Sequence, residues 1–331
     1  MNKHASGDRR FWYAQQKGTL FAALLFVAMF ALYVSNHPAG FTPNVVQTAS
    51  NKATLLAFVA MAQCLVVITA GIDLSAGMVL VLCNCLASWL VVGTPLQTGT
   101  GIVVVLLAGL GCGMLNGLII IFGRLQPIVA TIATSAIFYG LALLLRPTPG
   151  GSVNEDLADA FTSKLFGIVP ASLVVLLAVI VVIWVPFSRS AIGRAAYAVG
   201  SAENAAYMSA MPVKRAKFTA YALAGLLSAI GGLYLTFFSY TGEAAFASGN
   251  AYTLYSIAAV VLGGVSLAGG KGSAVGAVFG ALAFRTIGDL LFVFDFDPLW
   301  QPLFQGVVLM LAISIGCIGI ARVRNRLEWF Q

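Results

Sequence analysis

The side chains of this sequence that are suited to chemistry are mostly neutral amides and aromatic rings embedded in apolar runs. Neutral hydrogen-bonding groups and aromatic faces on a concave wall are what recognition of an uncharged, hydroxylated solute requires. The candidates for such a wall are Gln63, Asn84, Asn116, Gln126, Tyr139, Trp300, Gln301 and Gln305. Each of them has an alternative role, which is a hydrogen bond between two packed membrane helices.

Three ionisable residues, Asp73, Arg285 and Asp289, stand within or directly after apolar runs. An unpaired charge in hydrocarbon is costly, so each needs a partner or a function. Arg285 and Asp289 are spaced i, i+4, and we expect them to neutralise each other on one helix. Asp73 either fixes a gate or, as we prefer, satisfies free amides of the next helix together with Ser75. So few intramembrane carboxylates argue against proton- or sodium-driven symport.

Enzymatic chemistry is not indicated. The sequence has no phosphate-binding glycine loop followed by Lys and Ser or Thr, so we expect any ATP hydrolysis to reside in a separate partner subunit. The cysteines are interpreted as small packing residues rather than as a disulfide or a metal site. All five lie in apolar segments: Cys64, Cys83, Cys85, Cys112 and Cys317. We therefore expect no catalytic residue, no metal and no cofactor.

The elements that must position these residues follow from composition. The chain is 60% hydrophobic and only 9% charged, whereas a soluble domain is about 25% charged. Because unpaired backbone amides are costly in hydrocarbon, runs of this length must cross a bilayer as helices. We predict an all-α polytopic membrane protein, a single transmembrane domain over 1–331, with about ten spans at 18–36, 53–70, 74–93, 102–123, 126–145, 168–187, 217–237, 254–268, 274–293 and 302–321. A cleaved signal peptide over 1–36 is the disfavoured alternative, because 35–38 resembles a helix exit.

Charge assigns the sides of the membrane. An even number of spans places both termini on one side, and fourteen of the 18 Lys and Arg residues then fall on that side, which the positive-inside rule makes cytoplasmic. Residues 1–17 and 322–331 are the expected cytoplasmic ends. Lys52, Arg146 and Lys164 are left outside, and Arg285 lies within a span. The net charge of +7 is interpreted as topogenic rather than as a sign of nucleic-acid binding.

The segment 188–217 is the longest polar stretch on the cytoplasmic side. Gly200 and Ser201 are expected to start a short helix over 202–211, with Ser201 as its cap and Glu203 in its first turn, and Pro212 to end it. A short loop would have been enough to connect the flanking spans. We therefore expect a docking element, the alternative being a mere interfacial connector. Its basic flanks are Arg194, Lys214, Arg215 and Lys217.

Two glycine-rich segments interrupt helices that would otherwise span. Residues 71–77 and 264–270 share the pattern Gly, aliphatic, polar, Leu, small, small, Gly, which hints at an internal duplication. Broken helices are tolerated at membrane depth only where protein or a water-filled cavity covers them. The candidate gate or signature-loop residues are Gly71, Asp73, Ser75, Gly77, Gly263, Gly264, Gly269 and Gly270.

Four blocks together resemble one known family, the membrane permeases of sugar-importing ABC transporters of the ribose, xylose, arabinose and galactose type. They are Thr69–Gly77, Gln126–Thr131, Gly193–Lys217 and Ala258–Gly280, in the family's order and spacing. The resemblance extends along the whole chain. Ala70 and Ala210 depart from it, because the family usually has Gly at both positions.

The resemblance implies the ABC-importer permease fold in a bacterial inner membrane, with a cytoplasmic coupling helix at 203–211. It implies a homodimer or heterodimer of permeases, two cytoplasmic ATP-binding subunits and a periplasmic solute-binding protein. The expected activity is translocation of a pentose, hexose or sugar-like solute by alternating access, in contact with membrane lipid and without nucleic acid. The residues expected to couple to the ATP-binding subunit are Arg194, Glu203, Ala205, Ala206, Ser209, Lys214 and Arg215.

Several alternatives stay open. Import of an autoinducer or a nucleoside by the same branch is one alternative. Within the ABC class, a branched-chain amino-acid permease is the nearest alternative, but the block Gly71–Ser75 points to the sugar branch. A stand-alone facilitator or secondary transporter would work without an ATP-binding partner. A membrane scaffold or receptor without transport is the last possibility.

Overall fold

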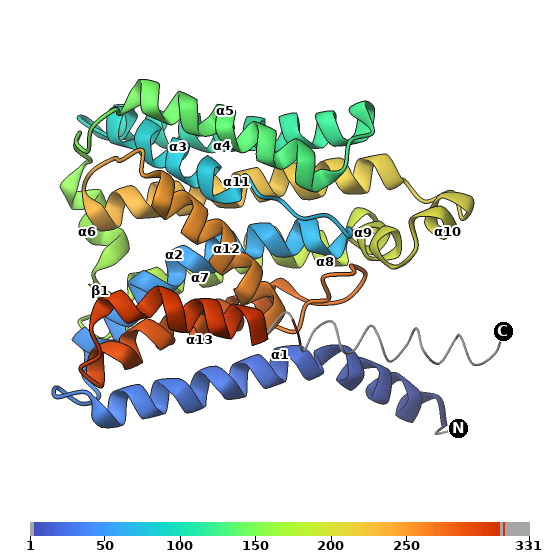
Figure 1. The fold of residues 1–331 in the computed structure, drawn as a ribbon, viewed down its shortest axis with the longest axis horizontal. Helices are drawn as coiled ribbons and strands as arrows, with labels where there is room; N and C mark the ends of the chain where they lie inside the picture. The colour runs from blue at the N-terminus through green and yellow to red at the C-terminus, as the bar shows by residue number, and fades with distance from the viewer. Residues whose placement is uncertain (1–2, 312–313, 315–331) are drawn as a thin grey trace.

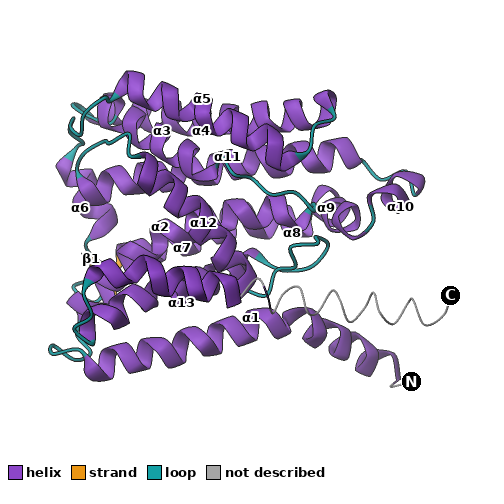
Figure 2. Cartoon of the chain, in the orientation of Figure 1, coloured by secondary structure: helices purple, strands orange, loops and turns teal. Residues whose placement is uncertain are grey.

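The computed structural model describes residues 3–311 and residue 314, and it is built almost entirely of helices (Figure 2). Its elements are α1 (Lys3–Asn36), α2 (Pro43–Ile68), α3 (Ala76–Leu90), α4 (Pro95–Gly123), α5 (Pro127–Leu145), α6 (Glu155–Thr162), β1 (Lys164–Leu165), β2 (Val169–Pro170), α7 (Ala171–Val179), η1 (Ile180–Trp184), α8 (Val185–Arg189), α9 (Ala191–Ser201), α10 (Glu203–Met208), α11 (Val213–Ser239), α12 (Phe246–Leu262), α13 (Ala274–Val293) and η2 (Pro298–Trp300). The last element opens a short apolar helix over Pro298–Leu311. Residues 312–313 and 315–321 of the expected span 302–321, together with Cys317 and the tail 322–331, lie outside the described residues.

Seven helices in the described part of the chain are long and apolar enough to cross a membrane. They are Lys17–Asn36, Pro43–Ile68, Pro95–Gly123, Pro127–Leu145, Ala171–Arg189, Val213–Ser239 and Ala274–Val293. Three shorter apolar helices, Ala76–Leu90, Phe246–Leu262 and Pro298–Leu311, stand where further spans are expected. The chain is thus an all-α polytopic membrane protein.

The start of α2 differs from its expected position, and this changes the position of Lys52. The α2 helix begins at Pro43 rather than at residue 53, because the Thr42 hydroxyl accepts a hydrogen bond from the Val45 amide and proline occupies the first helical turn. Lys52 therefore lies within a helix and not in an outer loop, which corrects its predicted place.

The α2 helix forms the centre of the bundle. In its most apolar window 94% of the residues are buried, whereas in α1 the share is 11%. The α1 helix presents exposed apolar side chains, among them Leu24, which is 70% exposed. Such an arrangement suits a bundle whose outer helices face lipid, because hydrocarbon solvates apolar side chains as well as a protein core does.

Small residues let α4 and α11 approach closely. A Cβ atom added to Gly113 would lie 2.2 Å from the carbonyl oxygen of Tyr221, and one added to Gly225 would lie 2.2 Å from the carbonyl oxygen of Gly109. The two backbones are therefore in direct contact. Glycines spaced four apart on one helix face are the usual means of such packing in membranes.

The molecule has two distinct ends (Figure 1). The α9 and α10 helices and the Lys3 end of α1 lie at one of them, which we call the α10 end. The α6 helix and the hairpin of β1 and β2, which pair antiparallel, lie at the opposite one, the α6 end. The predicted docking segment and the α6 loop thus belong to opposite faces of the bundle.

Candidate functional site

Two helices, α9 and α10, stand where one docking helix is expected. The Ser190 hydroxyl caps α9 by accepting a hydrogen bond from the Gly193 amide at 2.9 Å. The expectation that Gly200 and Ser201 start the docking helix is wrong, since both lie in the last turn of α9. Ser201 cannot cap, because its hydroxyl donates to the Tyr197 carbonyl of its own helix at 3.0 Å. The α10 helix begins only after an extended residue, Ala202.

The end of α10 also differs from the expectation. The helix stops at Met208, and its last carbonyls are satisfied by a Schellman motif, in which the Met211 amide donates to the Ala206 carbonyl at 3.0 Å. The motif needs a left-handed residue, and Ala210 supplies it with φ of 56°. Pro212 therefore lies beyond the turn that ends the helix.

The side chains of α10 divide into anchored and exposed groups. Glu203 forms an ion pair with Lys217 of α11 at 2.6 Å, and Ala206 is buried. Tyr207 and Met208 are 72% and 84% exposed. Sequence reasoning missed these two residues, although large apolar residues within a polar segment were a usable signal. We call them the α10 tip.

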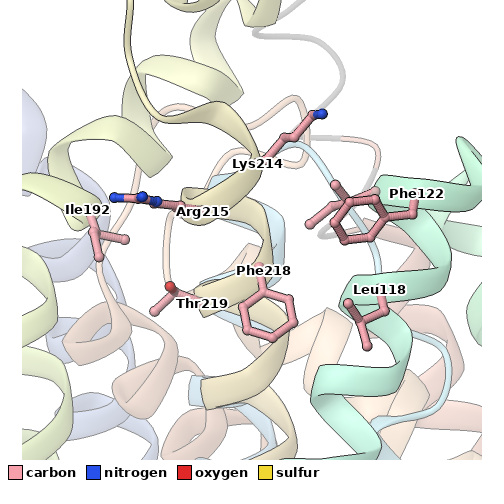
Figure 3. Close-up of a pocket in the computed structure, with 8 residues that line it drawn as sticks. Leu118, Phe122, Ile192, Lys214, Arg215, Phe218 and Thr219 are labelled. Atoms are coloured by element: carbon pink, nitrogen blue, oxygen red, sulfur yellow. The ribbon is translucent and has the colours of Figure 1, made fainter.

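The other predicted coupling residues are spread over α9, α10 and α11 and do not form one continuous surface with the α10 tip. Arg194 donates from its guanidinium to the Arg189 carbonyl at 2.9 Å, and Ala205 and Ser209 are exposed on α10. Lys214 and Arg215 lie in the first turn of α11, beside an apolar groove of 370 Å³. The groove is also lined by Leu118, Ile121, Phe122, Ile192, Phe218 and Thr219. Lys214 lies above the Phe122 ring, while Arg215 extends toward Ile192 (Figure 3).

Both predicted glycine loops meet the end of α9 at one point, which we call the glycine-loop junction. The Gly270 amide of the second loop donates to the Ile68 carbonyl, at the entrance of the first loop, at 3.0 Å. A Cβ atom at Gly200 would lie 1.9 Å from the Ile68 oxygen and 2.5 Å from the Gly270 nitrogen. One added to Gly269 would lie 2.8 Å from the Ala70 nitrogen. Only glycine permits this three-way backbone contact.

A further hydrogen bond ties α9 to the second loop. The Tyr197 hydroxyl donates to the Gly272 carbonyl at 2.6 Å. On the other side of the junction, the second loop also touches α1, since a Cβ atom at Gly264 would lie 2.3 Å from the Cα atom of Gly18. The remaining loop glycines pack against neighbouring helices, with Gly71 beside Tyr221, Gly77 beside Gly249 and Gly263 beside Gly276.

Asp73 is buried in the first loop and acts within it. Its carboxylate accepts hydrogen bonds from the Ser75 amide at 2.8 Å and the Ser75 hydroxyl at 2.6 Å. It therefore satisfies the amide of Ser75, the residue before α3, whereas the expectation was a bond to a free amide of the helix itself. Ser75 makes no capping bond, contrary to the expectation, because its hydroxyl donates to Asp73 and accepts from the Asn116 amide at 2.8 Å.

Three of the predicted solute-path amides form hydrogen bonds, or face hydrogen-bonding groups, within the protein itself. The Asn84 amide donates to Thr236 and accepts from the Glu243 backbone, both at 2.9 Å. Asn116 binds Ser75, as above, and accepts from the Thr134 hydroxyl at 2.6 Å. The fully buried Gln63 amide faces the backbone amide and carbonyl of Asp73. These residues hold helices and the first glycine loop together.

The remaining path candidates separate into two groups. Gln126 is exposed before α5, Tyr139 packs on Phe246 with ring centroids 5.0 Å apart, and Trp300 is 51% exposed. Gln301 and Gln305, in contrast, line a polar cavity of 210 Å³. Its other lining residues are Leu56, Ser248, Ala251, Tyr252, Tyr255, Phe284 and Arg285. Sequence reasoning missed the two tyrosines, which lie on α12.

The predicted ion pair between Arg285 and Asp289 is wrong. Asp289 binds Lys52 instead, with 3.4 Å between Nζ and Oδ1. The reason is the early start of α2, which brings Lys52 into the helix beside α13. Arg285 forms no ion pair in the part of the chain that the structure describes, and it lines the polar cavity.

Comparison with known proteins gives a consistent result. The model of the family described as "Branched-chain amino acid transport system / permease component" matches residues 45–313. The ribose import permease protein RbsC of Bacillus subtilis (strain 168) is 33% identical over 298 residues, which cover 88% of this chain and 90% of that protein. RbsC of Escherichia coli (strain K12) is 32% identical over 94% of this chain and 97% of its own length.

A protein of another name matches to a similar degree. The autoinducer 2 import system permease protein LsrD of Salmonella paratyphi A (strain ATCC 9150 / SARB42) is 31% identical over 94% of each chain. No solved structure matches this chain.

Proposed function

Because the chain belongs to the branched-chain amino acid transport system permease component family, we propose that it is the channel-forming subunit of an ATP-driven importer of a sugar or sugar-like solute. The similar relatives are named as import permeases for ribose and for autoinducer 2, and they match over nearly the whole chain. These names favour the sugar branch over branched-chain amino acids. ATP hydrolysis then belongs to separate subunits, and a periplasmic binding protein delivers the solute.

The proposed topology has ten spans in a bacterial inner membrane, with the α10 end in the cytoplasm. The charges of the two ends support it, because positively charged residues gather on the cytoplasmic side of membrane proteins. Basic residues of the α10 end include Arg124, Arg189, Arg194, Lys214, Arg215 and Lys271, while acidic residues of the α6 end include Glu155, Asp156 and Asp159.

The energy of ATP enters through α10. The observation that carries this assignment is the glycine-loop junction, where the end of α9 touches both interrupted helix pairs at once. A partner that pushes on the α10 tip displaces α9, and α9 displaces the loop between α2 and α3 and the loop between α12 and α13 together. Two packed arrangements of these helices provide the outward-open and inward-open states.

The α10 tip provides the first test. Replacing Tyr207 and Met208 by Ser removes apolar surface that a docked ATP-binding subunit would bury, so the amount of that subunit recovered with the tagged permease should fall at least tenfold. Since both side chains are exposed, the permease itself should be produced in normal amount.

The matched control is Phe166→Ser, which removes a 98% exposed aromatic residue near the opposite, α6 end. It should leave recovery of the ATP-binding subunit unchanged. Unchanged recovery with the α10-tip variant would remove α10 from the docking surface.

A further inference from the structure

We propose that the polar cavity between α12, α13 and the helix Pro298–Leu311 is a binding site for an uncharged, polyhydroxylated solute. Arg285 and Gln305 are its principal contacts, and Tyr252 and Tyr255 line its α12 side. The inference rests on the proposed function in that this solute is the one transported.

Unpaired polar atoms mark the cavity as a site. Gln305 is 1% exposed, yet neither its Oε1 nor its Nε2 atom has a partner among the described residues, and the same holds for Nε of Arg285. A buried polar group that is left without a partner loses the hydrogen bonds that it would make to water. A ligand that supplies these partners therefore binds favourably.

No carboxylate among the described residues neutralises the charge of Arg285. Asp289, one helical turn away, is held by Lys52 at 3.4 Å. An arginine at membrane depth that faces a cavity and has no carboxylate partner among the described residues is expensive to retain without a function. Its fork of donors is available to oxygen atoms of a solute.

The mixture of donors and acceptors favours hydroxyl groups over an anion. A carboxylate or phosphate only accepts hydrogen bonds, whereas each hydroxyl both donates and accepts. The amides of Gln301 and Gln305 and the tyrosine hydroxyls offer both functions. Tyr255 packs on Phe284, with ring centroids 5.1 Å apart, and these rings give an apolar wall for the C–H face of a sugar ring.

The size of the cavity matches a small solute. Its volume of 210 Å³ lies below the roughly 300 Å³ at which sites for drug-sized ligands begin. Gly288 lets the Gln301 side chain lie close to α13, since a Cβ atom there would lie 2.8 Å from the Gln301 amide nitrogen. A monosaccharide is therefore a better match than an oligosaccharide.

The site is also placed to respond to coupling. Its two tyrosines lie on α12 and Arg285 lies on α13, and the second glycine loop, 263–273, connects these two helices. A shift at the glycine-loop junction moves the two walls relative to each other. The solute is thus bound in one arrangement and released in the other.

Cysteine labelling tests the site without requiring transport. Ser248→Cys, in a chain whose native cysteines are replaced, places a thiol in the cavity wall. Its labelling rate with a small methanethiosulfonate reagent is measured alone, with a panel of neutral pentoses and hexoses, and with the anionic analogue ribonate. We expect at least one neutral sugar to slow labelling threefold or more, and Gln305→Leu to abolish that protection. Ser35→Cys, at the exposed end of α1, is the control and should not be protected.

The outcomes separate the site from the function. Protection by ribonate alone, or by no compound, overturns the proposed site, and ATP-driven uptake by the same complex would leave the importer function intact. Protection by a sugar together with a lack of ATP-driven uptake would support the site and contradict the proposed function.

Discussion

Two alanines of the chain, Ala70 and Ala210, adopt the left-handed backbone conformation, with φ of 61° and 56°. An L-residue pays about 1–2 kcal/mol for this conformation, whereas glycine adopts it readily. Both are the positions at which the sequence departs from the glycines of the resembled permeases. The structure therefore explains why glycine is usual there.

Ala210→Gly should stabilise the end of α10 by about 0.5–1 kcal/mol, since Ala210 is exposed and its methyl group contributes little packing. Amide hydrogen exchange in α10 should slow by about two- to fivefold. Ala205→Gly, inside the same helix, is the control and should speed exchange, because glycine is unfavourable in a helix interior. Faster exchange in Ala210→Gly would contradict the assigned turn.

Local partners could be predicted from sequence and distant ones could not. Asp73 binds the amide two residues ahead, and a local backbone partner follows from its place in the loop before α3. The i, i+4 rule assigned Asp289 to Arg285, but its partner Lys52 is 237 positions away on another helix. The polar cavity could not be predicted from the sequence either, since Gln305 and Tyr252 come together only when the helices pack.

Among the helices, α4 and α11 depend on backbone contact, so the glycine face of α4 should tolerate no side chain. Gly113→Ala places a Cβ atom 2.2 Å from the Tyr221 carbonyl, and we expect a loss of about 1–3 kcal/mol in stability. The thermal unfolding midpoint of the detergent-solubilised protein measures this loss.

Gly111 provides the matched control for that change. It lies two residues earlier on α4, and a Cβ atom there meets no atom within 4 Å. Gly111→Ala should leave the midpoint unchanged or raise it slightly. Equal loss in the two variants would show that the loss in Gly113→Ala does not come from contact with α11.

The predicted spans agree with the helices to within a few residues in most cases, because length and apolar composition decide them. The helix boundaries in the predicted docking segment were harder to predict. One helix over 202–211 was expected, but the Ser201 hydroxyl bonds within α9 and the Schellman turn at Ala210 ends α10 early. Competition among local hydrogen bonds decides such boundaries, and residue type alone does not reveal it.

For the whole molecule, charge predicted which segments share an end, and the α10 and α6 ends lie opposite each other (Figure 1). The convergence of the two glycine loops on α9 was not predicted. Each loop suggested an interrupted helix, but only the folded chain brings Ile68, Gly200 and Gly270 together. That contact joins the predicted docking segment to the helices around the polar cavity.

The most direct test of the account is solute accumulation in proteoliposomes that contain the permease, with or without its ATP-binding subunits and binding protein. The solute is the sugar that the co-purified binding protein retains. We expect accumulation above the external concentration only in the complete complex supplied with ATP. Tyr197→Phe, which removes the hydrogen bond from α9 to Gly272, should lower uptake per ATP hydrolysed. Uptake by the permease alone, at the rate of the complete complex, would contradict the account.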